Sequence, residues 1–375
     1  MKIKIVIAVN SSWNLVNFRS GLIRSMVESG YEVVAIAPFD EYSERLNELG
    51  CRYVPLPMDN KGINPIKDLL LLWRFYRFLR HERPAVFLSF TVKPNIYGSL
   101  ACNILRIPVI NNIAGLGVVF IKNSLLTSFL RILYKISHSK SHKVFFQNND
   151  DRQLFLESGL VSYIIADRVP GSGIDLKRFN FSKNVNRDVN RKFRFLLIAR
   201  MLWDKGVGEY VEAARLLRES GTHAEFCLLG FLDVQNSTAV SHRQMDDWVS
   251  EGVIQYLGVS DSVEKEIIKS DCVVLPSYYR EGVPHSLLES AAIGRPIITT
   301  NSVGCREVVD DGINGYLCKP RDYIDLSDKM KKMIALSWKE RQQMGLQGRK
   351  KMEYEFNEKI VIDKYLDVID QILSD

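Results

Sequence analysis

The feature that most constrains the fold of this chain is an alternation of short apolar runs with longer amphipathic runs, repeated twice. In the first half, the pattern predicts strands at residues 3–9, 32–37, 86–90, 108–112 and 143–147, with helical runs around 18–29, 41–49, 66–82, 95–105, 123–139 and 149–158. In the second half, strands at 194–199, 224–230, 253–257, 272–276 and 297–300 alternate with helices at 207–219, 240–250, 262–270 and 284–293. Strands that alternate with helices form parallel sheets covered by helices. The sequence therefore predicts an α/β protein with two doubly wound, Rossmann-like domains in tandem.

A polar stretch separates the two series. Residues 169–173 have the composition of a turn, and residues 181–191 are charged and lack an apolar period, which is typical of a linker. A chain of 375 residues is also long for a single core. We expect a first domain at residues 1–180, a second at 190–354, and a terminal helix at 355–375 that packs back on the first domain.

Composition excludes several classes of protein. No apolar run approaches the length of a transmembrane helix, and the N-terminus resembles a first strand rather than a signal peptide. Six scattered cysteines lack the spacing of a disulfide framework or a zinc site, which is typical of reduced thiols in the cytoplasm. The six histidines show no metal-ligand spacing and there is no D-x-D motif, so we expect neither a metal nor a cofactor.

The charge is distributed unevenly. The net charge of the chain is +6, but residues 61–143 contain 13 basic residues and only two acidic ones. Two helical runs in this segment, residues 69–80 and 125–134, have apolar and aromatic faces edged by Arg or Lys. Such helices bind anionic membrane surfaces, although helices that pack on a sheet also have one apolar face. We expect contact with an anionic membrane and, because no nucleic-acid-binding motif accompanies the charge, no nucleic acid.

One loop carries the clearest chemical signal. Glu281 and Glu289 lie eight positions apart, with a glycine, Pro284 and the start of a predicted helix between them. Pro284 suits the first helical position, and the helix N-terminus presents N–H groups to an anion. This combination predicts a phosphorylated ligand whose hydroxyl-rich part is held by carboxylates.

Two cations follow another predicted strand of the second domain. Arg200 comes directly after strand 194–199, and Lys205 precedes the next helix. Ligands of doubly wound sheets bind at the carboxyl ends of the strands. A guanidinium and an ammonium there suit a diphosphate, so we expect both cations to face the anion held by the Glu281 loop.

The motifs resemble those of a known family. Residues 199–207, 281–289 and 304–316 are similar to the retaining glycosyltransferases of family 4, which have the GT-B fold, two Rossmann-like domains facing across a cleft. The resemblance covers essentially the whole chain and is most specific in the second domain. It implies a sugar nucleotide as the donor substrate.

The resemblance also implies roles for matching residues. Arg200 and Lys205 would bind the donor diphosphate, Glu281 would contact the transferred sugar, and Glu289 would hold the nucleotide ribose. Backbone N–H groups near Ser286 and Leu287 would face the phosphate. The predicted catalytic residues are therefore Arg200, Lys205 and Glu281, and the predicted donor-binding residues are Gly282, His285, Ser286, Leu287 and Glu289.

The first domain resembles a narrower subgroup. Residues 18–19, 91–98 and 107–117 are similar to bacterial enzymes that build lipid-linked oligosaccharides for capsule, O-antigen and protein glycans. Many family members have a histidine where this chain has Ala114, so a histidine-assisted mechanism is not expected. The predicted acceptor-binding residues are Arg19, Lys93, Asn112, Gly115 and Gly117.

The expected function follows from these parts. The chain is predicted to transfer a hexose or N-acetylhexosamine, with retention, from a nucleoside-diphosphate sugar to a polyprenyl-diphosphate-linked saccharide. We expect a UDP-sugar donor and a peripheral location at the inner face of the cytoplasmic membrane. Two alternatives remain open, a sugar-nucleotide epimerase of the same fold and a catalytically silent sugar-nucleotide-binding subunit.

Overall fold

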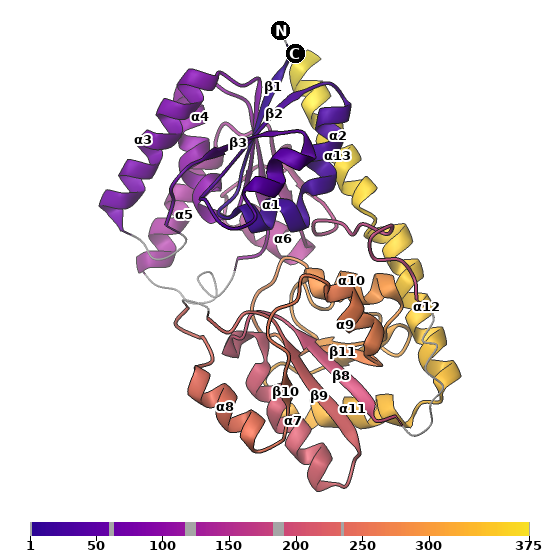
Figure 1. Ribbon diagram of the computed structural model, residues 1–375. Helices are drawn as coiled ribbons and strands as arrows, with labels where there is room; N and C mark the ends of the chain where they lie inside the picture. The colour runs from indigo at the N-terminus through magenta and orange to yellow at the C-terminus, as the bar shows by residue number, and fades with distance from the viewer. Residues whose placement is uncertain (1, 60–63, 117–124, 183–190, 234–235, 375) are drawn as a thin grey trace. The chain divides into compact units, whose positions relative to one another are not determined.

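The computed structural model describes residues 2–59, 64–116, 125–182, 191–233 and 236–374. The chain divides into two compact units (Figure 1). The first unit comprises Met1–Gly173 with Glu358–Asp375, and the second comprises Ile174–Asn357. The boundary after Gly173 lies seven residues before the expected end of the first domain, and most of the expected linker lies outside the described residues.

The first unit is built on a parallel sheet. Its strands have the order β3-β2-β1-β4-β5-β6-β7, and their bounds are β1 Lys4–Ala8, β2 Glu32–Ala37, β3 Arg52–Pro55, β4 Val86–Phe90, β5 Val109–Ile113, β6 Lys143–Phe146 and β7 Ala166–Arg168. After β1 the chain adds β2 and β3 on one side of it and then β4 to β7 on the other side, so the order of strands reverses at the boundary between β1 and β4. That is the topological switch point, where ligands of doubly wound sheets bind.

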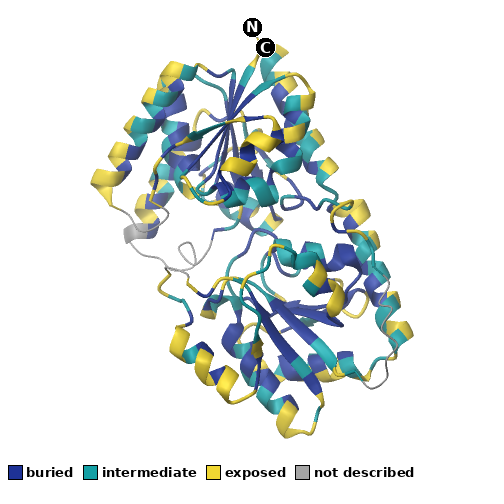
Figure 2. Ribbon diagram, viewed as in Figure 1, coloured by how far each residue is buried: buried dark blue, intermediate teal, exposed yellow. Residues whose placement is uncertain are grey.

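Helices cover both faces of this sheet. Their bounds are α1 Ser12–Phe18, α2 Ser20–Glu28, α3 Pro65–Glu82, α4 Ser99–Leu105, α5 Leu125–His138, α6 Asn149–Glu157 and α13 Glu358–Ser374. The 3₁₀ helix η1 (Glu44–Leu49) replaces the helix expected at 41–49, and the π turn η2 (Pro94–Gly98) precedes α4. The central strands are buried along their length, whereas each helix exposes its outer side (Figure 2).

The C-terminal helix belongs to the first unit. Val361, Tyr365, Val368 and Ile369 of α13 are buried in the same cluster as side chains of β1, β2 and α2. The Tyr365 hydroxyl accepts a hydrogen bond from Asn112 Nδ2 at 2.9 Å. The stretch expected at 355–375 is thus the separate helix α13, since the preceding helix α12 (Trp338–Glu355) packs in the second unit.

The second unit repeats the same topology. Its parallel strand order is β10-β9-β8-β11-β12-β13, with bounds β8 Phe193–Ile198, β9 Ala224–Leu229, β10 Gln255–Tyr256, β11 Cys272–Leu275, β12 Ile297–Thr300 and β13 Gly315–Cys318. Its helices are η3 Trp203–Lys205, α7 Val207–Glu219, α8 His242–Ser250, α9 Val263–Lys269, α10 His285–Ile293, α11 Tyr323–Ala335 and α12. The switch point lies between β8 and β11.

Three short strands were not predicted. They are β3, β7 and β13, of three or four residues each. Each forms because a neighbouring strand pairs with it, at β2, β6 and β12 respectively. Pairing and burial decide strand formation more than intrinsic preference does, so such short runs carry little signal in the sequence.

All six cysteines are free and buried. Within the described residues, no helix is long and apolar enough to cross a membrane.

Candidate active site

The switch point of the second unit brings the predicted catalytic residues together. Arg200 follows β8, Lys205 ends η3, and Glu281 lies in the loop after the neighbouring strand β11. Lys205 Nζ forms an ion pair with Glu281 Oε1, and the two side chains are 13% and 10% exposed. Two loops 76 positions apart in the sequence therefore meet at one pair of opposite charges.

Glu281 is held by a second contact, from a residue to which the sequence analysis assigned no role. The Ser277 hydroxyl donates to Glu281 Oε1 at 2.9 Å. The backbone carbonyl of Ser277 in turn accepts a hydrogen bond from the Ser302 hydroxyl at 3.0 Å. The signal for Ser277 was its place just after β11, four positions before Glu281.

The backbone of the Lys205 loop is fixed against the Glu281 loop. The carbonyl of Asp204 accepts hydrogen bonds from the backbone N–H groups of Tyr278 and Tyr279, each at 3.1 Å. The next residue, Gly206, has φ of 77°, and a Cβ there would lie 2.2 Å from the Pro276 carbonyl oxygen. Only glycine allows this close approach, so the conformation of the loop places Lys205 at Glu281.

A second glycine supports the other side of the Glu281 loop. Gly304 has φ of 81°, and a Cβ there would lie 2.2 Å from the carbonyl oxygen of Gly282 and 2.7 Å from that of Glu281. The predicted donor residue Gly282 therefore lies in backbone packed against the loop after β12. The backbone, rather than the side chains alone, determines where the Glu281 carboxylate lies.

Arg200 lies close to the same cluster but is not in the ion pair. It is exposed at the end of β8. Burial raises the pKa of Tyr279, the Glu281 charge adds to the rise, and the Arg200 charge opposes it. Arg200 is thus within electrostatic reach of Tyr279, whose ring centroid lies 5.2 Å from Lys205 Nζ.

The helix that follows Glu281 differs from the prediction in one respect. Pro284 is the N-cap of α10 rather than its first residue, because its ψ of 117° is extended. The Leu287 N–H donates to the Pro284 carbonyl at 3.1 Å, within the first turn of the helix. Ser286 is half-buried in that turn, while the Leu287 side chain is fully buried.

The two remaining donor residues pair with each other. His285 Nδ1 lies 2.8 Å from Glu289 Oε1, one helical turn away on α10, and both side chains are mostly buried. The His285 ring also lies edge-on to Phe179, with centroids 6.4 Å apart. Glu289 is therefore held in one orientation by its neighbour, as a residue that binds a ligand hydroxyl requires.

Of the predicted acceptor residues, Arg19 has the most unusual surroundings. It follows α1 and is buried, with only 5% of its surface exposed. Its guanidinium carbon lies 4.3 Å from the centroid of the Phe90 ring at the end of β4. Burial lowers the pKa of Arg19 to about 10, and its Nε has no hydrogen-bond partner within the described part of the chain. A buried cation in this state favours an anion beside it.

Thr91, which follows Phe90, is a residue that the sequence analysis quoted but gave no role. Its φ of 67° is a left-handed conformation, which is strained for a β-branched side chain. Its buried hydroxyl, like Arg19 Nε, has no hydrogen-bond partner among the described residues. Strained residues of this kind cluster at ligand sites.

Two other acceptor residues have partners inside the first unit. Lys93 Nζ forms an ion pair with Asp68 at 2.7 Å, and both side chains are mostly buried. Asn112 is fully buried and bonds Tyr365 of α13, so it also anchors that helix. Gly115 has φ of 96° after β5, and Gly117 lies outside the described residues.

The described residues contain no group of three His, Cys, Asp or Glu side chains that could hold a metal ion.

Comparison with known proteins identifies the family of the chain. The model of the "Glycosyl transferase 4-like domain" matches residues 17–164, and the model of "Glycosyl transferases group 1" matches residues 178–351. The chain therefore belongs to the GT-B glycosyltransferases that resemble family 4, and it is an enzyme that transfers a sugar.

Curated relatives narrow the class. Over 378 residues, and 96% of both chains, it is 28% identical to the N,N'-diacetylbacillosaminyl-diphospho-undecaprenol alpha-1,3-N-acetylgalactosaminyltransferase of Campylobacter jejuni. It is 23% identical to an Escherichia coli UDP-Gal:alpha-D-GlcNAc-diphosphoundecaprenol alpha-1,3-galactosyltransferase, covering 70% of this chain and 69% of the other. The relatives are thus glycosyltransferases of lipid-linked saccharide assembly.

Solved structures share the fold. A glycosyltransferase from Rickettsia africae matches with a TM-score of 0.78 at 17% identity, over 99% of both chains. Anabaena HepE in complex with UDP matches with a TM-score of 0.79 at 14% identity, over 99% of this chain and all of the other. At these identities the likeness establishes the GT-B fold of the chain.

Proposed function

We propose that the protein transfers an N-acetylhexosamine or hexose, with retention, from a UDP-sugar to a polyprenyl-diphosphate-linked saccharide. The transfer needs no metal or cofactor, and it takes place at the inner face of the cytoplasmic membrane. The name of the Campylobacter relative supports an acetamidosugar as the transferred group and a lipid diphosphate as the carrier. The UDP bound by the structural neighbour HepE supports uridine as the nucleoside of the donor.

The observation that carries the proposal is the convergence of Lys205 and Glu281. Because the pair fixes both side chains at one point, a donor whose diphosphate approaches Lys205 brings its sugar against Glu281. Glu289, held by His285 one turn into α10, is suited to accept hydrogen bonds from ribose hydroxyls. Arg200 adds a second positive charge on the diphosphate side of the cluster.

The chemistry follows from these charges. The acceptor hydroxyl oxygen attacks the anomeric carbon while the bond from that carbon to the UDP oxygen breaks. The hydroxyl proton passes to the leaving phosphate, which lies on the same face of the sugar, so the anomeric configuration is retained. Negative charge grows on the phosphate, and Lys205 and Arg200 stabilise it there.

The first unit offers features that suit the acceptor. Arg19 and Thr91 lie after α1 and β4, close to the switch point between β1 and β4, and each has a buried polar atom without a partner in the described residues. A phosphate oxygen of the acceptor diphosphate would provide a partner for both. Gly115, at the end of neighbouring β5, allows the ligand close to the backbone.

The membrane is the proposed location because of α5 and its neighbour α4. Phe129, Ile132 and Ile136 of α5 are 48–56% exposed, and Ile104 of α4 is 63% exposed. The surrounding segment is strongly basic. An anionic bilayer covers apolar side chains and attracts the basic ones, so both features favour it as the partner.

The test is the release of UDP by the full chain. Four UDP-sugars, those of glucose, galactose and their two 2-acetamido derivatives, are each supplied with and without a short-chain polyprenyl-diphosphate saccharide. UDP is expected only when an active donor and the acceptor are both present, and NMR of the product is expected to show an α linkage. Donor turnover without acceptor would indicate an epimerase, and donor binding without UDP release would indicate a silent subunit. Either result overturns the proposal.

A further inference from the structure

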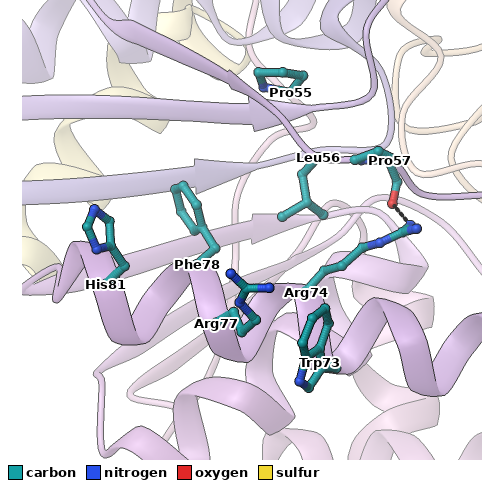
Figure 3. A pocket seen from close by; sticks show the side chains of 8 residues that line it. All are labelled: Pro55, Leu56, Pro57, Trp73, Arg74, Arg77, Phe78 and His81. Atoms are coloured by element: carbon teal, nitrogen blue, oxygen red, sulfur yellow. Dashed lines mark hydrogen bonds between the residues drawn. The ribbon is translucent and has the colours of Figure 1, made fainter.

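An open pocket of about 370 Å³ lies in the first unit, between the end of β3 and α3 (Figure 3). The segment leaving β3 forms one wall, and side chains of α3 form the other. Its lining residues are Pro55, Leu56, Pro57, Trp73, Arg74, Arg77, Phe78 and His81. The lining thus contains two arginines, a histidine and two aromatic rings, but no acidic residue.

The two arginines are held by neutral groups. Arg74 Nη1 donates to the backbone carbonyl of Pro57 at 2.7 Å, which Figure 3 marks with a dashed line. The guanidinium carbon of Arg77 lies 4.7 Å from the centroid of the Trp73 ring. Within the described part of the chain neither arginine has a carboxylate partner, so the pocket carries uncompensated positive charge.

The two acidic side chains of the basic segment are already neutralised. Asp68 pairs with Lys93 at 2.7 Å. Glu82, which follows His81, pairs with Lys4 at 2.8 Å and with Arg52 at 2.5 Å, and this lowers the pKa of Glu82 against the effect of its burial. Neither acid is therefore available to the pocket arginines.

An exposed apolar row leads into the pocket along α3. Ile66, Leu69, Leu70 and Trp73 are 81%, 68%, 43% and 51% exposed. Their spacing of three and four residues puts them on one side of the helix, and Arg77 continues that side one turn beyond Trp73. The row covers about 10 Å at the helical rise of 1.5 Å per residue. One side of α3 is thus apolar near its N-terminus and cationic near its C-terminus.

We propose that this pocket binds the headgroup phosphate of an anionic membrane phospholipid, with the acyl chain along the apolar row of α3. The guanidinium of Arg77 contacts the phosphate, and Trp73 lies at the junction of head and chain. An acidic peptide would match the charge but would leave the apolar row exposed, whereas a phospholipid satisfies both parts. The inference rests on the proposed action at a membrane, and it adds a discrete lipid site outside the transfer site.

The first experiment measures binding of the full chain to vesicles of phosphatidylcholine with and without 30% phosphatidylglycerol. R80A is the matched control for R77A, because Arg80 is an exposed arginine of the same helix that does not line the pocket. If the protein is attracted to the surface only by diffuse charge, the loss of either arginine lowers the affinity for vesicles by about the same factor, roughly fivefold. The pocket predicts at least a further fivefold loss for R77A. Equal losses in both variants would overturn it.

The second experiment uses soluble probes and the fluorescence of Trp73, with W73F to identify its signal. Dihexanoyl phosphatidylglycerol, below its micelle concentration, is expected to change this signal saturably in the wild type and in R80A but not in R77A. Inorganic phosphate and dihexanoyl phosphatidylcholine are expected to have little effect. An equal response to phosphate alone, or to a glutamate-rich peptide, would refute a phospholipid as the ligand.

The two proposals can fail separately. With a short-chain acceptor and no vesicles, R77A is expected to release UDP at the wild-type rate, because none of the residues that line the pocket is assigned to transfer. Loss of lipid binding with intact transfer supports the pocket. Absence of UDP release in wild type and variant alike would refute the proposed reaction but leave the lipid measurements valid.

Discussion

Replacing Lys205 by alanine is the most direct test of the transfer site. Lys205 faces Glu281 across two loops, and both side chains are nearly buried. The substitution removes the proposed stabilising charge from the leaving phosphate, and it also leaves the Glu281 carboxylate without this cation. The two consequences differ in size and in the measurement that reports them.

The catalytic loss is expected to be large. Removing one preorganised group that stabilises developing charge typically costs about 100- to 1000-fold in kcat. The cost in stability has a separate origin. Breaking a buried ion pair from one side costs about 3–5 kcal/mol, and the residual exposure of this pair puts the expected value near the lower limit. Thermal unfolding and turnover must therefore be measured on the same samples.

A double-mutant cycle separates the two effects. In K205A/E281Q the uncompensated carboxylate is gone, so much of the stability lost in K205A is expected to return while kcat stays low. K269A is the control, because Lys269 forms an exposed ion pair with Glu266 at 2.7 Å in the same unit, and such pairs contribute little. If K205A keeps more than half of the wild-type turnover at saturating donor, the role assigned to Lys205 is wrong.

Three further substitutions test the remaining features. Arg19→Met is expected to raise the KM for the acceptor at least tenfold and the KM for the donor less than twofold, since the buried cation is assigned to the acceptor phosphate; equal effects on both would contradict that role. Gly206→Ala is expected to lower kcat and to cost more than about 1 kcal/mol of stability, because its Cβ would displace Pro276; an unchanged melting temperature would be inconsistent with the loop packing. Burial of His138 in α5 lowers its pKa from 6.5 to about 4. The unfolded state therefore takes up the proton first, and stability is expected to fall by about 3 kcal/mol as the pH drops from 6.5 to 4. Urea unfolding should show this slope in the wild type and a weaker one in His138→Gln.

Much of the fold was predictable because long periodic runs are strong signals. Buried strands such as β2 and β4 are continuous apolar segments, and long helices such as α7 have a clear 3.6-residue period. The strand β3 could not be predicted, because none of its four residues is buried and it exists through pairing with β2. The boundary at Gly173 was likewise displaced, because Ile174 and Phe179 are buried in a core cluster of the second unit.

The candidate site, like the fold, was predictable only in part. Sequence alone identified the groups to which we assign the chemistry: Lys205 after one strand, and Glu281 and Glu289 after another, in motifs that resemble those of glycosyltransferases. Only the tertiary structure decided which of these side chains contact each other. Side chains far apart in sequence meet because parallel strands end at one edge of the sheet, and loop glycines allow the backbones to touch. The burial of Arg19 against Phe90 also depends on packing between distant segments, which local sequence does not encode.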